Sequence, residues 1–259
     1  MEPPIPPLLF AVFLLIGMLL LLEVGRRFGL RRRPKESEGE RGGLGTVEGA
    51  VFALFGLMVA FTFSGAASRF NEKRMLIAEE TNTIETAYLR LQLLPQQAQP
   101  ALQELFRRYV DPRLETYRRL PDMAAAEMEM AKSKQIQEEI WAEAVAATRL
   151  PDSHPSAGLL LLPALNNMID ISTTRTVALQ LHPPRIIYAL LFGLGLICSL
   201  LAGFRMSSGQ HRSWLHILGF TVLTVIIVYV MLDVEYPRVG LIRLESDDQL
   251  LVHLREHMK

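Results

Sequence analysis

Apolar residues along the chain gather in four long blocks that carry few or no charges. Each block is about long enough to cross ~30 Å of hydrocarbon as an α-helix, and the charged residues fall almost entirely between the blocks. Such runs must be helical, because lipid offers the backbone no hydrogen-bond partner. The four predicted spans are Pro7–Leu22, Val47–Ala67, Ile186–Phe204 and Trp214–Leu232.

A long hydrophilic insert separates the second span from the third. Prolines divide it into stretches whose apolar residues recur every three or four positions, which is typical of amphipathic helices. The clearest stripe comprises Leu102, Leu105, Phe106, Tyr109, Val110, Leu114 and Tyr117. No stretch combines alternating polarity with hairpin signals, so strands are not expected. Neither Gly nor Pro occurs between Gly65 and Pro95, which predicts that the second span continues as one helix to about Leu93.

These patterns predict an all-α membrane protein with four transmembrane helices and a bundle of about four helices between helices 2 and 3. Four regions follow along the chain. Residues 1–67 hold the first two spans and a basic loop, and residues 68–184 form the extramembrane bundle. Residues 185–234 hold the last two spans, and residues 235–259 form a C-terminal tail.

The basic residues suggest an orientation in the membrane. Seven Lys and Arg residues lie between Arg26 and Gly43, whereas none precedes the first span. They favour a true span over a cleaved signal peptide. By the positive-inside rule this loop is cytoplasmic, which leaves both termini and the insert outside. Other basic residues lie near span ends on the opposite side, so the reverse orientation stays open.

No pattern in the sequence predicts an enzyme, a cofactor or a nucleic-acid partner. The net charge is zero, and the single cysteine, Cys198, lies within the third span, where a small apolar filler is the simplest role. His253, Glu256 and His257 match the inverted zinc-protease pattern H-x-x-E-H. Because the chain ends shortly afterwards and offers no evident third ligand, we interpret them as solvated side chains rather than a metal site.

Two of the predicted spans carry faces with a second interpretation. Small residues spaced by four in the third span, Gly195, Ser199 and Gly203, allow another helix to approach closely, either within the chain or from another copy. In the second span the face comprises Ala53, Leu57, Phe61, Ser64 and Ser68. This face is core in a single bundle, but in a ring of subunits it would line an axial constriction.

Ionisable residues are rare within the spans. Glu48, His216 and Asp233 all lie within about two turns of a predicted membrane surface. They could therefore reach water, which weakens the usual presumption that an intramembrane charge is functional.

Several short stretches resemble a bacterial membrane family known as bestrophin-like. The resemblance rests on Glu79-Glu80-Thr81-Asn82, Ala87-Tyr88-Leu89-Arg90 and Leu94-Pro95. It continues in Ala60-Phe61-Thr62-Phe63-Ser64-Gly65 and in Tyr236-Pro237-Arg238-Val239-Gly240-Leu241-Ile242-Arg243. It covers most of the chain, and it implies a multi-pass protein of the bacterial cytoplasmic membrane.

The run Arg69-Phe70-Asn71-Glu72-Lys73-Arg74 after Phe61 is also similar to the bestrophin channels themselves. That resemblance implies a pentamer whose second span lines a neck through Phe61, Leu57 and Ala53, with the insert in the cytoplasm. Two features depart from the channel pattern, since the second aromatic is Asn71 and the polar pair after the neck phenylalanine is not evident. The implied orientation is opposite to the one that the basic loop favours.

Two functional hypotheses follow. The first is an oligomeric channel for inorganic ions, embedded in the lipid bilayer and pentameric by resemblance, whose second span lines the pore. The second is a non-conducting scaffold or sensor whose insert binds a partner through its amphipathic helices.

Overall fold

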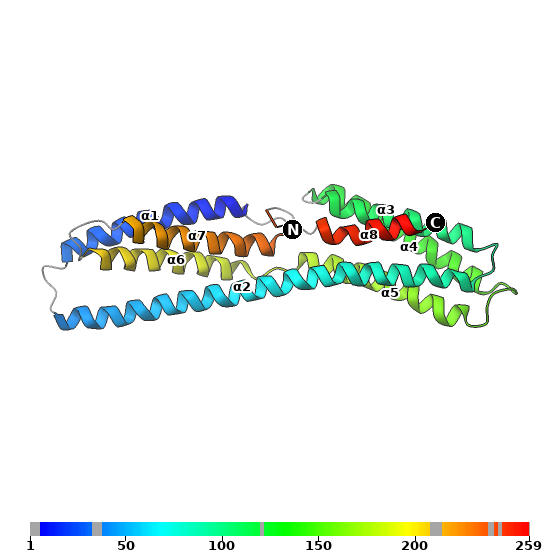
Figure 1. The fold of residues 1–259 in the computed structure, drawn as a ribbon, viewed down its shortest axis with the longest axis horizontal. Helices are drawn as coiled ribbons and strands as arrows, with labels where there is room; N and C mark the ends of the chain where they lie inside the picture. Colours follow the sequence, from blue (N-terminus) through cyan, green and yellow to red (C-terminus); the bar gives the residue numbers. More distant parts are fainter. Residues whose placement is uncertain are drawn as a thin grey trace. The chain divides into compact units, whose positions relative to one another are not determined.

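The structure is a computed structural model that describes residues 6–32, 38–119, 122–207, 214–237, 241–242 and 245–258. All regular elements in these ranges are helical (Figure 1), which confirms the predicted all-α fold. The helices are α1 (Pro7–Arg32), α2 (Glu38–Leu89), the 3₁₀ turn η2 (Arg90–Leu93), α3 (Gln99–Arg119), α4 (Met123–Thr148), α5 (Ala157–Gln180), α6 (Arg185–Met206), α7 (Trp214–Glu235) and α8 (Glu245–His257).

The predicted membrane spans are confirmed as helices that are long and apolar enough to cross a bilayer. Four such stretches occur in the described chain: Pro7–Arg31, Gly45–Leu93, Ala157–Met206 and Trp214–Glu235. The unbroken second helix is also confirmed, because α2 runs to Leu89 and η2 extends it to Leu93. Pro95 follows directly and has no backbone N–H with which to continue the helix.

The chain divides into two compact units. The membrane unit comprises the described residues of 6–70 and 182–241, and the bundle unit comprises those of 71–181 and 242–258. The long helix α2 therefore contributes its first part to the membrane unit and its second part to the bundle unit.

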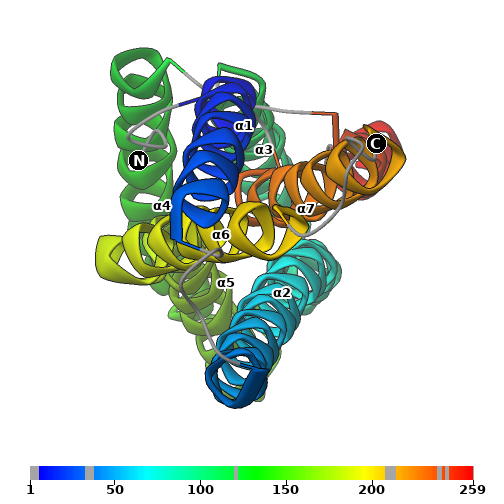
Figure 2. The same cartoon turned by 90° about the vertical axis from the view of Figure 1, so that its left-hand side faces the viewer.

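The membrane unit has its core between α1, α6 and α7. The apolar residues buried there include Leu14, Met18, Leu191, Cys198 and Val228. Figures 1 and 2 show α6 between α1 and α2, so α2 lies at the edge of this unit. Only 17 % of the most apolar stretch of α2 is buried, against 28 % to 39 % in the other three candidate spans.

The bundle unit has its core where the predicted stripes meet. Six of the seven residues of the stripe in α3 are buried, and Leu105 packs against them. The N-terminus of α4 is capped by the carboxylate of Asp122, which accepts a hydrogen bond from the backbone N–H of Ala125 at 3.1 Å. Ser156 occupies the capping position of α5, but its side chain makes no capping hydrogen bond. Leu251 and Leu254 of α8, and Met258 directly after it, join the core.

Candidate functional site

The face of α2 that the sequence singles out is exposed along its whole length. Leu57 and Phe61 have 53 % and 70 % of their surface exposed, and Ala53, Ser64 and Ser68 are exposed as well. In the described chain this face is therefore not part of a bundle core. Large apolar side chains left open in this way need lipid or another protein chain to cover them.

An apolar groove lies directly beside this face. It has a volume of about 390 Å³ and lies entirely within the membrane unit. Its lining comprises Leu54, Leu57, Met58, Phe61, Thr62, Gly65 and Arg69 of α2 together with Pro183 and Ile187. Thr62 uses its hydroxyl to donate a hydrogen bond to the backbone carbonyl of Met58 at 2.7 Å. Among the described residues that line the groove, Arg69 alone is charged.

A second exposed face of α2 consists of small residues. It comprises Gly49, Ala53, Gly56 and Ala60. A Cβ atom placed on Gly49 or Gly56 would meet no atom of the chain within 4 Å. Another helix could therefore approach the backbone closely along this face, and no helix of the same described chain does so.

A three-residue polar cluster lies at the end of the groove. Arg69 donates through Nη2 to Glu235 Oε2 at 2.7 Å, and its Nε lies 3.1 Å from Oε1 and 3.0 Å from Oε2. His182 Nδ1 lies 3.1 Å from Glu235 Oε1. The Glu235 side chain is only 1 % exposed, so its charge is held by these two partners rather than by water. The cluster joins α2, the linker before α6, and the end of α7.

The small-residue stripe of the third span is buried within the chain. Gly195, Ser199 and Gly203 all lie in the membrane unit's interior. A methyl group on Gly203 would overlap the backbone carbonyl of Leu22 on α1, and one on Gly25 would overlap the carbonyl of Leu200. Only residues without a Cβ allow α1 and α6 to approach so closely. In this structure the stripe serves packing within one chain.

The ionisable residues of the spans have different surroundings. Glu48 is buried and accepts a hydrogen bond from Arg205 Nη1 at 3.1 Å. Asp233 is 1 % exposed and accepts a hydrogen bond from the backbone N–H of Leu241 at 2.9 Å. His216 is exposed. The two carboxylates are thus engaged in contacts that link neighbouring segments of the membrane unit.

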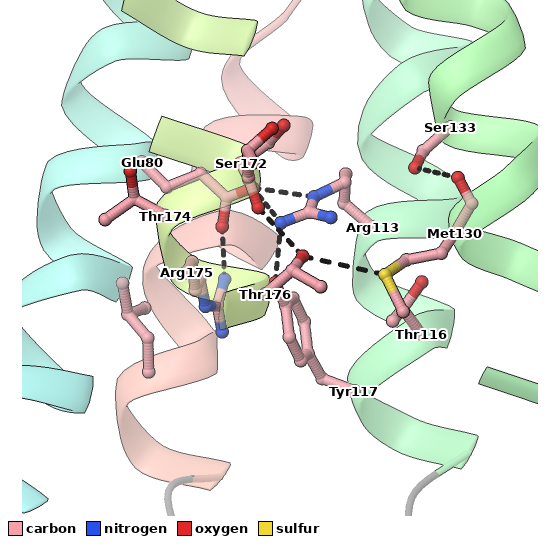
Figure 3. Close-up of polar contacts among 12 residues, drawn as sticks. Glu80, Arg113, Thr116, Tyr117, Met130, Ser133, Ser172, Thr174, Arg175 and Thr176 are labelled. Atoms are coloured by element: carbon pink, nitrogen blue, oxygen red, sulfur yellow. Dashed lines mark hydrogen bonds and ion pairs between the residues drawn. The ribbon is translucent and has the colours of Figure 1, made fainter. Parts of the chain in front are cut away.

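A larger network of charged residues lies inside the bundle unit (Figure 3). Glu80 of α2 is fully buried and accepts hydrogen bonds from Arg113 of α3, at 2.6 Å from its Nε, and from Arg175 of α5. Arg175 also donates to Asp248 of α8 at 2.9 Å. The centroid of the Tyr117 ring lies 3.5 Å from Cζ of the Arg175 guanidinium. The Tyr117 hydroxyl accepts a hydrogen bond from Arg113 Nη2 at 2.6 Å. Two cations and two anions thereby join four helices.

The network fixes the protonation state of its members. Burial opposes ionisation of Glu80, but the charges of Arg113 and Arg175 outweigh it and hold the pKa of that carboxyl below its usual value. Burial likewise disfavours the charged forms of both arginines. The negative groups beside them nevertheless raise the pKa of Arg113 and of Arg175. All three residues therefore stay charged at neutral pH, and the network acts as a structural clamp.

Sequence reasoning missed most of these residues. Glu80 and Arg69 entered only through the resemblances, and Arg113, Arg175 and Glu235 were not singled out. A usable signal was present, because Arg113 continues the three- and four-residue spacing of the buried stripe that holds Phe106 and Tyr109. A charged residue at a core position of an amphipathic helix predicts a buried ionic partner.

The H-x-x-E-H pattern lies on α8. His253, Glu256 and His257 are all exposed. His253 Nδ1 lies 3.6 Å from a carboxylate oxygen of Glu256, and His257 Nδ1 lies 2.6 Å from the backbone carbonyl of His253. Among the described residues, no group of three or more potential ligands could hold a metal ion.

Comparison with known proteins gives one match. The family model of the bestrophin-like domain matches residues 11–248, which is nearly the whole chain. No curated protein and no solved structure matches. The matched range includes both units, the exposed face of α2 and the network around Glu80.

Proposed function

This chain belongs to the bestrophin-like family, and from that premise we propose that it is a membrane protein that assembles into a ring and conducts small inorganic ions. In this proposal α2 lines the central pore, with Leu57 and Phe61 at its narrowest point. The observation that carries the proposal is the exposure of both side chains on the helix that is least buried in its own chain.

The arrangement of residues around α2 supports a ring. At about 100° per residue, the membrane part of α2 has three faces. One is buried against its own chain through Glu48, Phe55 and Ala66. The small-residue face and the groove face are both open, and their centres lie about 150° apart on the helix.

A helix in a closed ring needs two contact faces of this kind. In such a ring the contacts are heterologous, so that one face of each helix meets a different face of the next copy. The small-residue face would pack against the groove face of the next copy. The direction between them points away from the buried face, and Leu57, Ser64 and Ser68 lie on it, with Ala53 and Phe61 about 40° to either side. Those residues would face the axis.

The chemistry of the axial residues suits a gated path for ions. Rings of Leu57 and Phe61 would make an apolar constriction, and such constrictions block ions by excluding a continuous column of water. Ser64 and Ser68 follow one and two turns later and would place hydroxyl groups at the mouth. Ion selectivity would then depend on groups outside the constriction.

Flux through reconstituted vesicles tests the proposal. Phe61→Ala should widen and wet the constriction and raise the flux of small ions above that of the wild type. Phe63→Ala is the matched control, because Phe63 is also exposed on α2 but lies about 120° from the axial direction. Silent vesicles with wild type and both variants would contradict the channel. Equal increases from both variants would contradict the assignment of the axis.

A non-conducting scaffold is the second candidate, and one observation favours it. The bundle unit exposes large apolar side chains where α2 and α5 meet. Leu89, Leu159 and Leu160 have 55 %, 78 % and 42 % of their surface exposed, and Arg90 Nη1 donates to the Leu160 carbonyl at 2.5 Å. Such a patch suits a protein partner. Changing Leu159 to Glu should abolish partner binding while leaving any ion flux unchanged.

A further inference from the structure

The cluster of Arg69, His182 and Glu235 contains a histidine at a junction of three segments of the membrane unit. Histidine is the side chain whose charge ordinarily changes between about pH 5 and 8. The His182 side chain is 13 % exposed, so it is largely withdrawn from water yet still within reach of a proton. Its ring stacks on Tyr236 with 4.5 Å between centroids, which fixes its orientation.

The geometry allows Glu235 to bind both partners at once. The shortest contact of Arg69 is to Oε2, at 2.7 Å, whereas His182 lies at Oε1. A carboxylate offers about four lone pairs on its two oxygens. A positive charge on His182 therefore adds to the Arg69 contact instead of displacing it.

We propose that His182 is a pH-sensitive latch that holds the linker before α6 against the end of α7, beside the contact that Arg69 of α2 makes with the same carboxylate. When the ring is neutral, the Nδ1–H tautomer donates an ordinary hydrogen bond to Glu235. When the ring is protonated, the same contact becomes an ion pair to a carboxylate that is shielded from water, where charge interactions are stronger than at a surface. Acid therefore tightens the junction, and alkali loosens it.

Other charged and titratable groups surround the cluster and contribute to the electrostatic field at His182. Besides Arg69 and Glu235 they are Tyr236, which directly follows α7, and Arg185 and Tyr188 on α6. Both arginines stay charged over this pH range, and tyrosines ordinarily stay neutral. Histidine is the side-chain type in this set whose charge ordinarily changes between about pH 5 and 8.

The latch is placed where it can act on the groove. Arg69 and Pro183 both line the groove, and Pro183 directly follows His182. A tighter contact between the linker and α7 therefore fixes the end of the groove as well as the end of the membrane part of α2. The inference concerns the conformation of the membrane unit and does not require that the protein conducts.

Thermal unfolding of the full-length protein in detergent at about pH 8 and about pH 5.5 tests the latch. A contact that becomes stronger when His182 is protonated stabilises the folded protein at the lower pH. That stabilisation is lost as pH rises. On going from the higher to the lower pH, the unfolding temperature of the wild type should therefore rise by about 2–4 °C relative to that of His182→Gln. His182→Lys, which carries its charge at both pH values, should be as stable at the higher pH as at the lower.

A matched control is His154→Gln, which removes a histidine of the bundle unit whose Nδ1 accepts a hydrogen bond from the backbone N–H of Ser156. This variant should keep the wild-type response to pH. Glu235→Gln should lose the response even though it retains an oxygen acceptor. A His182→Gln protein with the same response as the wild type would overturn the latch, as would a His154→Gln protein that loses it.

Discussion

The two parts of α2 belong to one continuous helix but have opposite surroundings. In the bundle unit Ile77, Ile84 and Ala87 are at most 1 % exposed, and the fully buried Glu80 has two arginine partners. In the membrane unit Leu57 and Phe61 are more than half exposed. The apolar side chains of the bundle part are therefore covered within the chain. Those of the membrane part are left exposed to lipid or to other copies of the chain.

This difference separates stability from function along one helix. Substitutions in the bundle part should act mainly on folding, because each removes buried contacts that nothing replaces. Substitutions in the membrane part should act mainly on assembly and flux, because the chain itself makes few contacts there. Each prediction below tests this contrast, beginning with the largest expected effect.

Removal of the Glu80 carboxylate should be the most damaging single change. Glu80→Ala leaves Arg113 buried without its carboxylate and Arg175 with Asp248 alone, and unpaired buried charges of this kind cost about 3–5 kcal/mol. Thermal or denaturant unfolding of the purified protein measures the loss. The matched control is Glu79→Ala at an exposed neighbouring position, which should change stability by no more than about 0.5 kcal/mol.

Truncation of apolar side chains should separate the two parts of α2 directly. Ile84→Ala creates a cavity in the bundle core and should cost about 2–5 kcal/mol of unfolding free energy. Leu57→Ala removes a similar side chain from an exposed face and should cost far less. Comparable losses in both variants would show that Leu57 is core and that the two parts of α2 do not differ.

These predictions depend on features that the sequence revealed unequally. The spans, the continuous α2 and the stripes of the bundle could be predicted, because each repeats a local rule of hydrophobicity and helical period. The exposed face of α2 could be placed on one side of the helix. Whether that face is core depends on how α1, α6 and α7 pack, which no local pattern records.

The polar sites were harder to predict for the same reason. Arg113 and Arg175 lie 33 and 95 residues beyond Glu80, and Asp248 lies 73 residues beyond Arg175. Glu235 and Arg69 are separated by 166 positions. Such pairs are brought together only by tertiary packing. The orientation of the bundle relative to the membrane stays a prediction, because the positive-inside rule and the bestrophin resemblance favour opposite sides.

A bulky residue on the small-residue face should interfere with assembly. Gly56→Leu should shift the protein toward smaller species, since overpacking a close helix contact costs about 1–3 kcal/mol. Gly219 on α7 is the matched control, because a Cβ there also meets nothing within 4 Å. Size-exclusion chromatography with light scattering reads out the result. Equal behaviour of the two leucine variants would remove the support for this face as an interface.

Acid should also destabilise the bundle part of α2, but by less than the substitutions above. The pKa of Glu80 is below its usual value in the folded protein. Its ionisation therefore stabilises the fold above the pKa of the unfolded chain, and that contribution is lost as pH falls through the folded value. Unfolding curves of the wild type should show this decline below about pH 4. Glu80→Gln should lack that component.

The central claim is that other copies of this chain complete the membrane part of α2. Native mass spectrometry of the wild-type protein, released from lipid nanodiscs, tests it most directly. The account predicts a closed ring, with five copies as the number that the bestrophin resemblance implies. A protein that remains monomeric in lipid would contradict it, because Leu57 and Phe61 would then face acyl chains and no axial path could form.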